Sequence, residues 1–213
     1  MTIKKNNNSL LFLYEGETEA EFYHRIIDLY VPPRKIRINY SNLKGVYSIT
    51  EKVCSKIELY LHNEASFSCN KINVFVAYDR DGPRETETRL DIKSLKQMYL
   101  NKGSRISSIN EIVATQDLES WFFHDIEGIY NYLKAPKNKR AKTFNNVEAT
   151  NWRVLSDLFH RFNMHYQKGK KASGFLVHLN IDKICSNVQE LKDAVTFINQ
   201  LCSSKKPRKS HWK

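Results

Sequence analysis

Three acidic side chains stand directly after apolar segments of strand length. Glu15 follows the run SLLFLY (9–14), and Asp79 and Asp81 follow the run INVFVAY (72–78). Because ligands of a parallel α/β sheet bind beyond the carboxyl ends of its strands, we expect these carboxylates to meet at one edge of a sheet. Carboxylate oxygens are the hard ligands that Mg²⁺ and Mn²⁺ prefer, so the pattern predicts a divalent-metal site.

The spacing of the two aspartates suits a shared cation. In an extended loop, residues two apart point the same way, so Asp79 and Asp81 can share one metal while Arg80 faces elsewhere. Gly82 and Pro83 favour a tight turn here and disfavour a helix. An Asp-x-Asp pair is also ordinary turn chemistry, so the pair becomes informative only together with Glu15.

Segments of strand length alternate along the chain with segments of helical periodicity. The first strand, 9–14, is followed by a helix that a capping box at Thr18 and Glu21 is expected to start and Pro32 to end. Three further strand–helix pairs follow. Their strands are expected at 35–40, 72–78 and 109–114, and their helices at 46–61, up to Tyr99 and from Asp117. The alternation predicts an α/β fold with a mainly parallel, Rossmann-like sheet flanked by helices.

The segments LLFLYEGETEAEFY and VFVAYDRDG together resemble the Toprim domain of topoisomerases, primases and OLD-family nucleases. In that domain a Glu follows the first strand and Asp-x-Asp follows a later one. The likeness covers roughly residues 9–125, and the form EGxTE looks most like OLD-family and short defence-associated Toprim nucleases. It implies a Toprim-like fold, Glu15 as general acid or base and metal ligand, and Asp79 and Asp81 as ligands of Mg²⁺ or Mn²⁺. It also makes Glu19 a candidate ligand of a second metal.

A second acidic stretch, ATQDLESWFFHD (114–125), follows the fourth strand and resembles the acidic-Trp segment of short Toprim-like defence proteins. Two interpretations of it remain open. Glu119 is a candidate metal ligand that would complete a two-metal cluster. Alternatively, Asp117 simply caps a helix that carries Trp121 and Phe122 into the core.

The net charge of +11 is concentrated in one part of the chain. Residues 1–133 contain 17 Lys or Arg and 18 Asp or Glu, whereas residues 134–213 contain 17 and 5. We expect a Toprim-like catalytic domain over 1–133, a small basic, mainly helical C-terminal lobe over 134–202, and a basic tail over 203–213. A basic lobe suits a polyanionic partner such as nucleic acid, although charge runs are also common on solvated surfaces.

Lys168 lies in the segment QKGKKASG (167–174), for which we expect a flexible loop. An ammonium group there would neutralise charge that develops on a phosphate during cleavage, which makes Lys168 a catalytic candidate; nonspecific phosphate contact is the alternative. His165 and Tyr166 beside it either stack on an unpaired base or are buried aromatic residues. The residues expected to contact nucleic acid are Lys137, Lys139, Arg140, Lys142, Lys168, Lys170, Lys171, Lys205, Lys206 and Arg208.

The resemblance implies a Mg²⁺- or Mn²⁺-dependent nuclease that hydrolyses phosphodiester bonds in DNA and acts in bacterial defence against phage. Two alternatives stay open: a Toprim ribonuclease that acts on tRNA or another structured RNA, and a noncatalytic nucleic-acid-binding subunit. The chain lacks the GxxxxGK[ST] loop of an ATPase, so any ATP dependence would require a separate ATPase or sensor protein.

The remaining composition bounds the setting of the protein. Four cysteines without a CxxC pair indicate reduced thiols, and the N-terminal apolar run is too short to span a membrane. We therefore expect a cytoplasmic protein with no membrane partner, and a homo-oligomer is left open.

Overall fold

The computed structural model describes residues 8–63, 71–80, 90–101, 103–140 and 147–203. Some of the predicted site residues lie outside the described residues. They are Asp81, Lys142, Lys205, Lys206 and Arg208.

In the described part of the chain, four strands form one parallel sheet in the order β2-β1-β3-β4. The strands are β1 (Asn8–Tyr14), β2 (Arg37–Asn42), β3 (Lys71–Asp79) and β4 (Ile106–Ala114). The central strands β1 and β3 are almost continuously buried, as apolar strands covered on both faces must be. The predicted fold class, a parallel α/β sheet flanked by helices, is confirmed.

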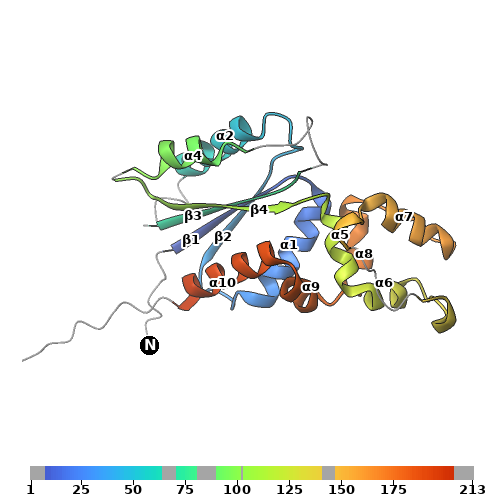
Figure 1. Cartoon of the computed structure of the whole chain (residues 1–213). Helices are drawn as coiled ribbons and strands as arrows, with labels where there is room; N and C mark the ends of the chain where they lie inside the picture. The colour runs from blue at the N-terminus through green and yellow to red at the C-terminus, as the bar shows by residue number, and fades with distance from the viewer. Residues whose placement is uncertain (1–7, 64–70, 81–89, 102, 141–146, 204–213) are drawn as a thin grey trace, which may run out of the picture.

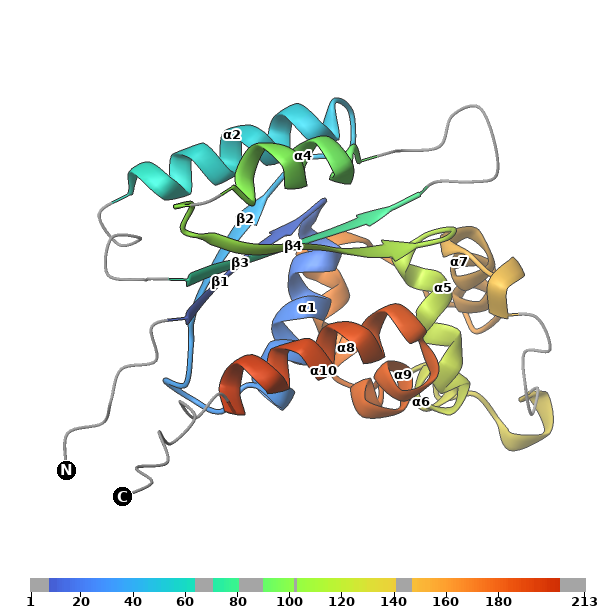
Figure 2. The same ribbon diagram turned by 60° about the vertical axis from the view of Figure 1, so that its left-hand side comes forward.

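Alternate side chains of the strands supply two cores, one on each face of the sheet. Leu11 and Leu13 of β1 pack with α2 (Ile49–His62) and α4 (Ile92–Tyr99) on one face. Leu10 and Phe12 pack on the other face, against α1 (Glu17–Tyr30) and α10 (Gln189–Ser203). Figure 1 and Figure 2 show the resulting three layers.

The chain after β4 is helical. It contains short helices that lie beside α1 and the carboxyl edge of the sheet (Figure 1). They are α5 (Leu118–Phe122), α6 (Ile126–Tyr132), α7 (Trp152–Arg161), α8 (Ser173–Leu176) and α9 (Ile181–Asn187), with the 3-10 turns η1 (Phe123–Asp125), η2 (Lys137–Lys139), η3 (Val147–Ala149) and η4 (Gly169–Ala172). Among the described helices, none has the length and apolar character needed to cross a bilayer.

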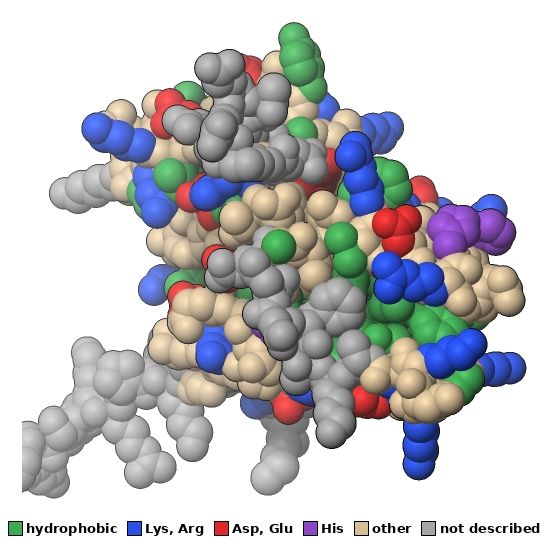
Figure 3. All heavy atoms as spheres, turned by 45° about the vertical axis from the view of Figure 1, so that its right-hand side comes forward, with side chains coloured by type: hydrophobic (Ala, Val, Ile, Leu, Met, Phe, Trp, Pro, Cys, Tyr) green, Lys and Arg blue, Asp and Glu red, His purple; other side chains and the backbone are tan. Residues whose placement is uncertain are grey.

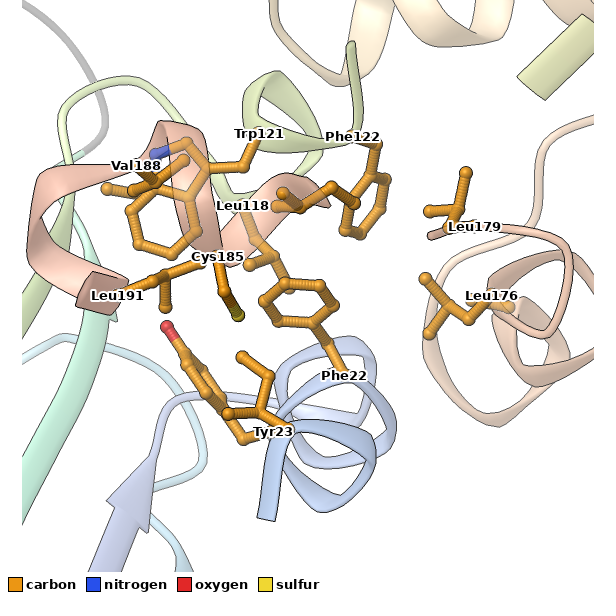
Figure 4. Packing of buried hydrophobic residues seen from close by; sticks show 14 of the residues in the cluster. Phe22, Tyr23, Leu118, Trp121, Phe122, Leu176, Leu179, Cys185, Val188 and Leu191 are labelled. Atoms are coloured by element: carbon orange, nitrogen blue, oxygen red, sulfur yellow. The ribbon is translucent and has the colours of Figure 1, made fainter. Parts of the chain in front are cut away.

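Helix α1 joins the sheet to these later helices. Phe22 is fully buried, and its ring centroid lies 5.5 Å from that of Tyr23 and 5.4 Å from that of Phe122 on α5. Figure 4 shows Phe22 and Tyr23 pointing into a cluster that includes Cys185 of α9 and Leu191 of α10. The helices beyond residue 134 therefore share a hydrophobic core with α1 and the sheet. The boundary between residues 133 and 134 stays a prediction.

Because this core is shared, the sheet and the C-terminal helices are expected to unfold in one transition. Phe22→Ala should lower the free energy of unfolding by roughly 3–5 kcal/mol, since it leaves a cavity where α1 meets α5. Leu29→Ala on the same helix should change it by less than about 0.5 kcal/mol, because Leu29 is 54% exposed. Urea denaturation followed by circular dichroism measures both. Two separate transitions, only one of which shifts in Phe22→Ala, would contradict the shared core.

Candidate active site at the carboxyl edge of the sheet

Glu15 and Asp79 lie where the strand order reverses. The chain runs from β1 outward to β2 and then returns past β1 to β3, so the adjacent strands β1 and β3 flank the switch point at which α/β sheets bind ligands. Glu15 follows β1, and Asp79 is the last residue of β3. The backbone N–H of Asp79 donates to Glu15 Oε2 at 3.2 Å. The structure thus brings these two predicted residues together.

Glu19 joins them from the first turn of α1. Its side chain is only 8% exposed and folds back over Gly16, where a Cβ atom would lie 2.8 Å from Glu19 Oε2. Gly16 has an extended backbone that any residue adopts, so the requirement for glycine is one of space. A side chain at this position would push the Glu19 carboxylate out of its site.

The predicted capping box at Thr18 and Glu21 is wrong. Helix α1 begins at Glu17, with Gly16 at the N-cap and no side-chain cap. The Thr18 hydroxyl instead accepts a hydrogen bond from the backbone N–H of Gly169 at 2.7 Å. The Thr18 oxygen that a capping box would use therefore accepts a tertiary hydrogen bond instead.

The same contact corrects the expected flexible loop at 167–174. This segment forms η4 and α8 and packs against α1. Gly169 has a φ of +75°, a conformation that favours glycine, and a Cβ there would lie 3.0 Å from Glu17 Oε2. The backbone next to Lys168 is therefore held against the start of α1.

Asp117 and Glu119 have different roles in the second acidic stretch. Asp117 caps α5 by accepting from Ser120 N–H at 3.1 Å, and its second oxygen accepts from Trp152 N–H at 2.7 Å. The capping interpretation is confirmed for Asp117. Glu119 is fully buried and accepts from the Tyr166 hydroxyl at 2.9 Å through Oε1. Within the described residues its other oxygen, Oε2, is buried without a hydrogen-bond partner.

Lys168 supplies positive charge to this cluster. Its Nζ lies 3.3 Å from Glu119 Oε1, and half of its side chain remains exposed. Burial by itself would lower the Lys168 pKa, but the charges of Glu119 and Asp117, together with the hydrogen bond to Glu119, outweigh it and raise the pKa. Lys168 therefore stays protonated beside the carboxylates.

The carboxyl groups perturb one another. Burial first, and then the charges of Glu119 and Glu15, raise the Glu19 pKa to about 7, against the opposing effects of a backbone hydrogen bond and Lys168. Asp79 is also buried, and its pKa lies well above the ordinary value because of burial first and then the charges of Glu19, Glu15, Glu119 and Asp117. Separate strand ends have thus placed several acids within range of one another's charge, and a proton or a cation must offset their repulsion.

The donor chemistry of this cluster suits a hard divalent cation. Glu15, Glu19, Asp79 and Glu119 offer carboxylate oxygens, and the unpartnered Oε2 of Glu119 is a buried acceptor of the kind a cation would satisfy. Within the described ranges, no three His, Cys, Asp or Glu side chains are already grouped closely enough to hold a metal ion. Asp81, the third of the acids predicted at the strand ends, lies outside those ranges.

The other basic candidates have different environments. Lys137, Lys139, Lys170 and Lys171 are exposed, and their contact with nucleic acid stays a prediction. Arg140 is engaged within the protein: it donates to Ala135 O at 2.9 Å and pairs with Glu127 at 3.0 Å. Its guanidinium group would have to leave these partners to contact a phosphate.

The aromatic residues near Lys168 also differ from one another. The Tyr166 ring packs against Phe159 and Phe175, with centroids 5.4 and 6.0 Å away, so Tyr166 is a partly buried aromatic residue at the edge of the core. Sequence reasoning missed Trp152, whose ring lies 5.5 Å from Lys168 Nζ. No local pattern marks this residue, because its neighbours in the site come from distant parts of the chain.

Fold and site together define a parallel α/β protein with a buried acidic cluster at its switch point. The chain belongs to the family described as Domain of unknown function (DUF4276), whose sequence model matches residues 14–199. The matched range contains every described residue of the cluster. No curated protein and no solved structure matches the chain significantly.

The carboxylate cluster predicts a stability effect that depends on pH. The Glu19 pKa is raised to about 7 in the folded protein. As pH rises from the ordinary pKa of a glutamate to above 7, ionisation of Glu19 therefore lowers the free energy of unfolding. In metal-free buffer, Glu19→Gln should therefore raise the free energy of unfolding at pH 8 by roughly 1–3 kcal/mol and change it little at pH 4. Urea denaturation at the two pH values measures the difference.

The matched control is Glu51→Gln on α2, because Glu51 is exposed and α2 covers the face of the sheet opposite to α1, the helix that carries Glu19. This variant should show little change at either pH. A Glu19→Gln protein that is less stable than the unmutated protein at pH 8 would contradict the raised pKa of Glu19, which burial and the neighbouring carboxylates cause.

Proposed function

We propose that this protein is a Mg²⁺- or Mn²⁺-dependent nuclease that hydrolyses phosphodiester bonds in DNA, with a site of the Toprim type. The observation that carries the proposal is the cluster at the switch point, in which Glu19, Asp79 and Glu119 are buried, Glu15 is partly exposed, and Lys168 is paired to Glu119. Few tasks justify burying so many acids together. Holding hard cations against a phosphate is one of them.

Each acid has a place in this proposal. Glu15, Asp79 and Asp81 would hold the divalent cation, and Glu19 and Glu119 are the candidates for a second cation. A bound cation would neutralise phosphate charge and lower the pKa of a water molecule. Glu15 also transfers a proton at the reacting centre, because it lies directly beside Asp79.

Lys168 acts on the phosphate. Its ammonium group reaches the buried carboxylates and is still half exposed, so it can contact both the cluster and an incoming substrate. Charge that develops on the phosphate oxygens would be stabilised by this fixed cation. Tyr166 and Gly169 position Lys168, the first through Glu119 and the second through Thr18.

Substrate binding is assigned to the basic C-terminal part of the chain. The excess of 17 Lys or Arg over 5 acids in residues 134–213 favours a polyanion. The exposed Lys170 and Lys171 lie on η4, which directly follows Lys168 in the chain. A role in antiviral defence and a separate ATPase or sensor partner remain expectations from the resemblance.

The test is cleavage of supercoiled plasmid, single-stranded DNA and total tRNA with Mg²⁺, Mn²⁺ or EDTA. Asp79→Asn and Lys168→Met should each lower the cleavage rate by roughly 100-fold or more, because each removes charge from the reacting centre. Glu51→Gln on the exposed face of α2 should cut as fast as the unmutated protein. Preference for tRNA would move the assignment to the ribonuclease alternative.

Cleavage that persists in EDTA, or in Asp79→Asn, would contradict the proposal. If no substrate is cut, calorimetric titration with Mn²⁺ decides whether the site binds metal. Binding to the unmutated protein but not to Asp79→Asn would retain the metal site, whereas equal behaviour of the two proteins would favour the noncatalytic alternative.

A further inference from the structure

Trp152 stands at the rim of the acidic cluster. It is the first residue of α7, and the residue is 42% exposed, whereas Trp121 of α5 is only 7% exposed. Its backbone is fixed from two sides. Asn151 caps α7, and Asp117 accepts the Trp152 N–H at 2.7 Å. The backbone that carries this partly exposed indole is thus anchored to Asp117, the residue that caps α5.

The Trp152 ring and the cluster share one cation. Lys168 Nζ lies 5.5 Å from the centre of the Trp152 ring and 3.3 Å from Glu119 Oε1. The guanidinium carbon of Arg153 lies 5.7 Å from the centre of the same ring. Figure 3 shows Lys and Arg side chains gathered around an apolar area on the side of the molecule that carries α5 and α7.

This combination matches the chemistry of a nucleotide. An exposed aromatic ring stacks on the face of a base, and nearby cations contact the phosphates on either side of it. Lys168 and Arg153 have long, exposed side chains, so they can turn from the ring toward such phosphates when a base arrives. In a duplex the base faces are already stacked on each other, so only an unpaired or flipped base can meet the ring.

We propose that Trp152 is the base-stacking residue of this site and that the substrate is a nucleic acid with an unpaired nucleotide next to the phosphate held by Lys168. The inference deepens the proposed nuclease function and rests on it for the identity of the reacting phosphate. In this proposal Trp152 provides the preference for single strands. The surrounding lysines attract the phosphates of any sequence.

Binding in EDTA tests this assignment without any need for cleavage. A labelled single-stranded 15-mer, as DNA and as RNA, and the corresponding duplex are titrated at one fixed salt concentration. Trp152→Ala should weaken binding of the better single strand about tenfold or more and leave duplex binding unchanged. Trp152→Phe should retain most of the affinity, since it keeps an aromatic face. Leu59→Ala, which removes an exposed apolar side chain on α2, should bind like the unmutated protein.

A strand of the same length that lacks all of its bases keeps the test independent of how well the variant folds. The unmutated protein should bind this abasic strand more weakly than the normal strand by about the factor lost in Trp152→Ala, and the Trp152→Ala protein should bind the two strands equally. Equal binding of the two strands by the unmutated protein, an equal loss for duplex and single strand in Trp152→Ala, or no binding of either strand would overturn the assignment.

The two proposals fail in distinguishable ways. Asp79→Asn should keep the Trp152-dependent binding in EDTA, because the substitution leaves the Trp152 ring, Lys168 and Arg153 in place. If the Trp152-dependent binding is found but no substrate is ever cut, the stacking assignment stands and the nuclease function falls. If cutting depends on Asp79 but binding does not depend on Trp152, the nuclease function stands and the stacking assignment falls.

Discussion

The mutual repulsion of buried carboxylates at one edge of a parallel sheet is the constraint on which the rest of the site depends. Burying an ionised carboxylate without a partner is costly, and here Glu19, Asp79 and Glu119 are buried within range of one another's charge. The protein offsets part of this cost with Lys168 and with the Tyr166 hydroxyl, both directed at Glu119. The pKa values of Glu19 and Asp79 remain raised, by burial first and then by the neighbouring carboxylates, so the offset is incomplete.

Holding Lys168 at the cluster requires the C-terminal helices to share the core of the sheet domain. The Gly169–Thr18 hydrogen bond joins η4 to the first turn of α1, and Phe22 packs α1 against α5. Acids from the strand ends and a lysine from the basic half of the chain therefore meet in one site. The same arrangement places Trp152 at its rim, because Asp117 binds the start of α7. The acidic cluster and the basic C-terminal part of the chain thus contribute side chains to the same site.

Sequence reasoning succeeded where a local rule determined the geometry. Apolar runs located all four observed strands, and the strand-end rule placed Glu15 beside Asp79, because residues that follow adjacent parallel strands must meet. Sequence reasoning failed where a residue far along the chain determined the contacts of a side chain. Thr18 has the right spacing for a cap, yet its hydroxyl binds Gly169, which is 151 residues away. The contact of Tyr166 with Glu119, 47 residues apart, and the exposed position of Trp152 likewise depend on tertiary packing that periodicity does not encode.

The central claim is that this buried carboxylate cluster holds a divalent cation, and anomalous diffraction from crystals soaked in Mn²⁺ tests it most directly. The account predicts an anomalous peak bounded by the carboxylates of Glu15 and Asp79, which disappears in Asp79→Asn crystals. Mn²⁺ bound only at other surfaces, with no peak at the cluster and Lys168 still paired to Glu119, would contradict it.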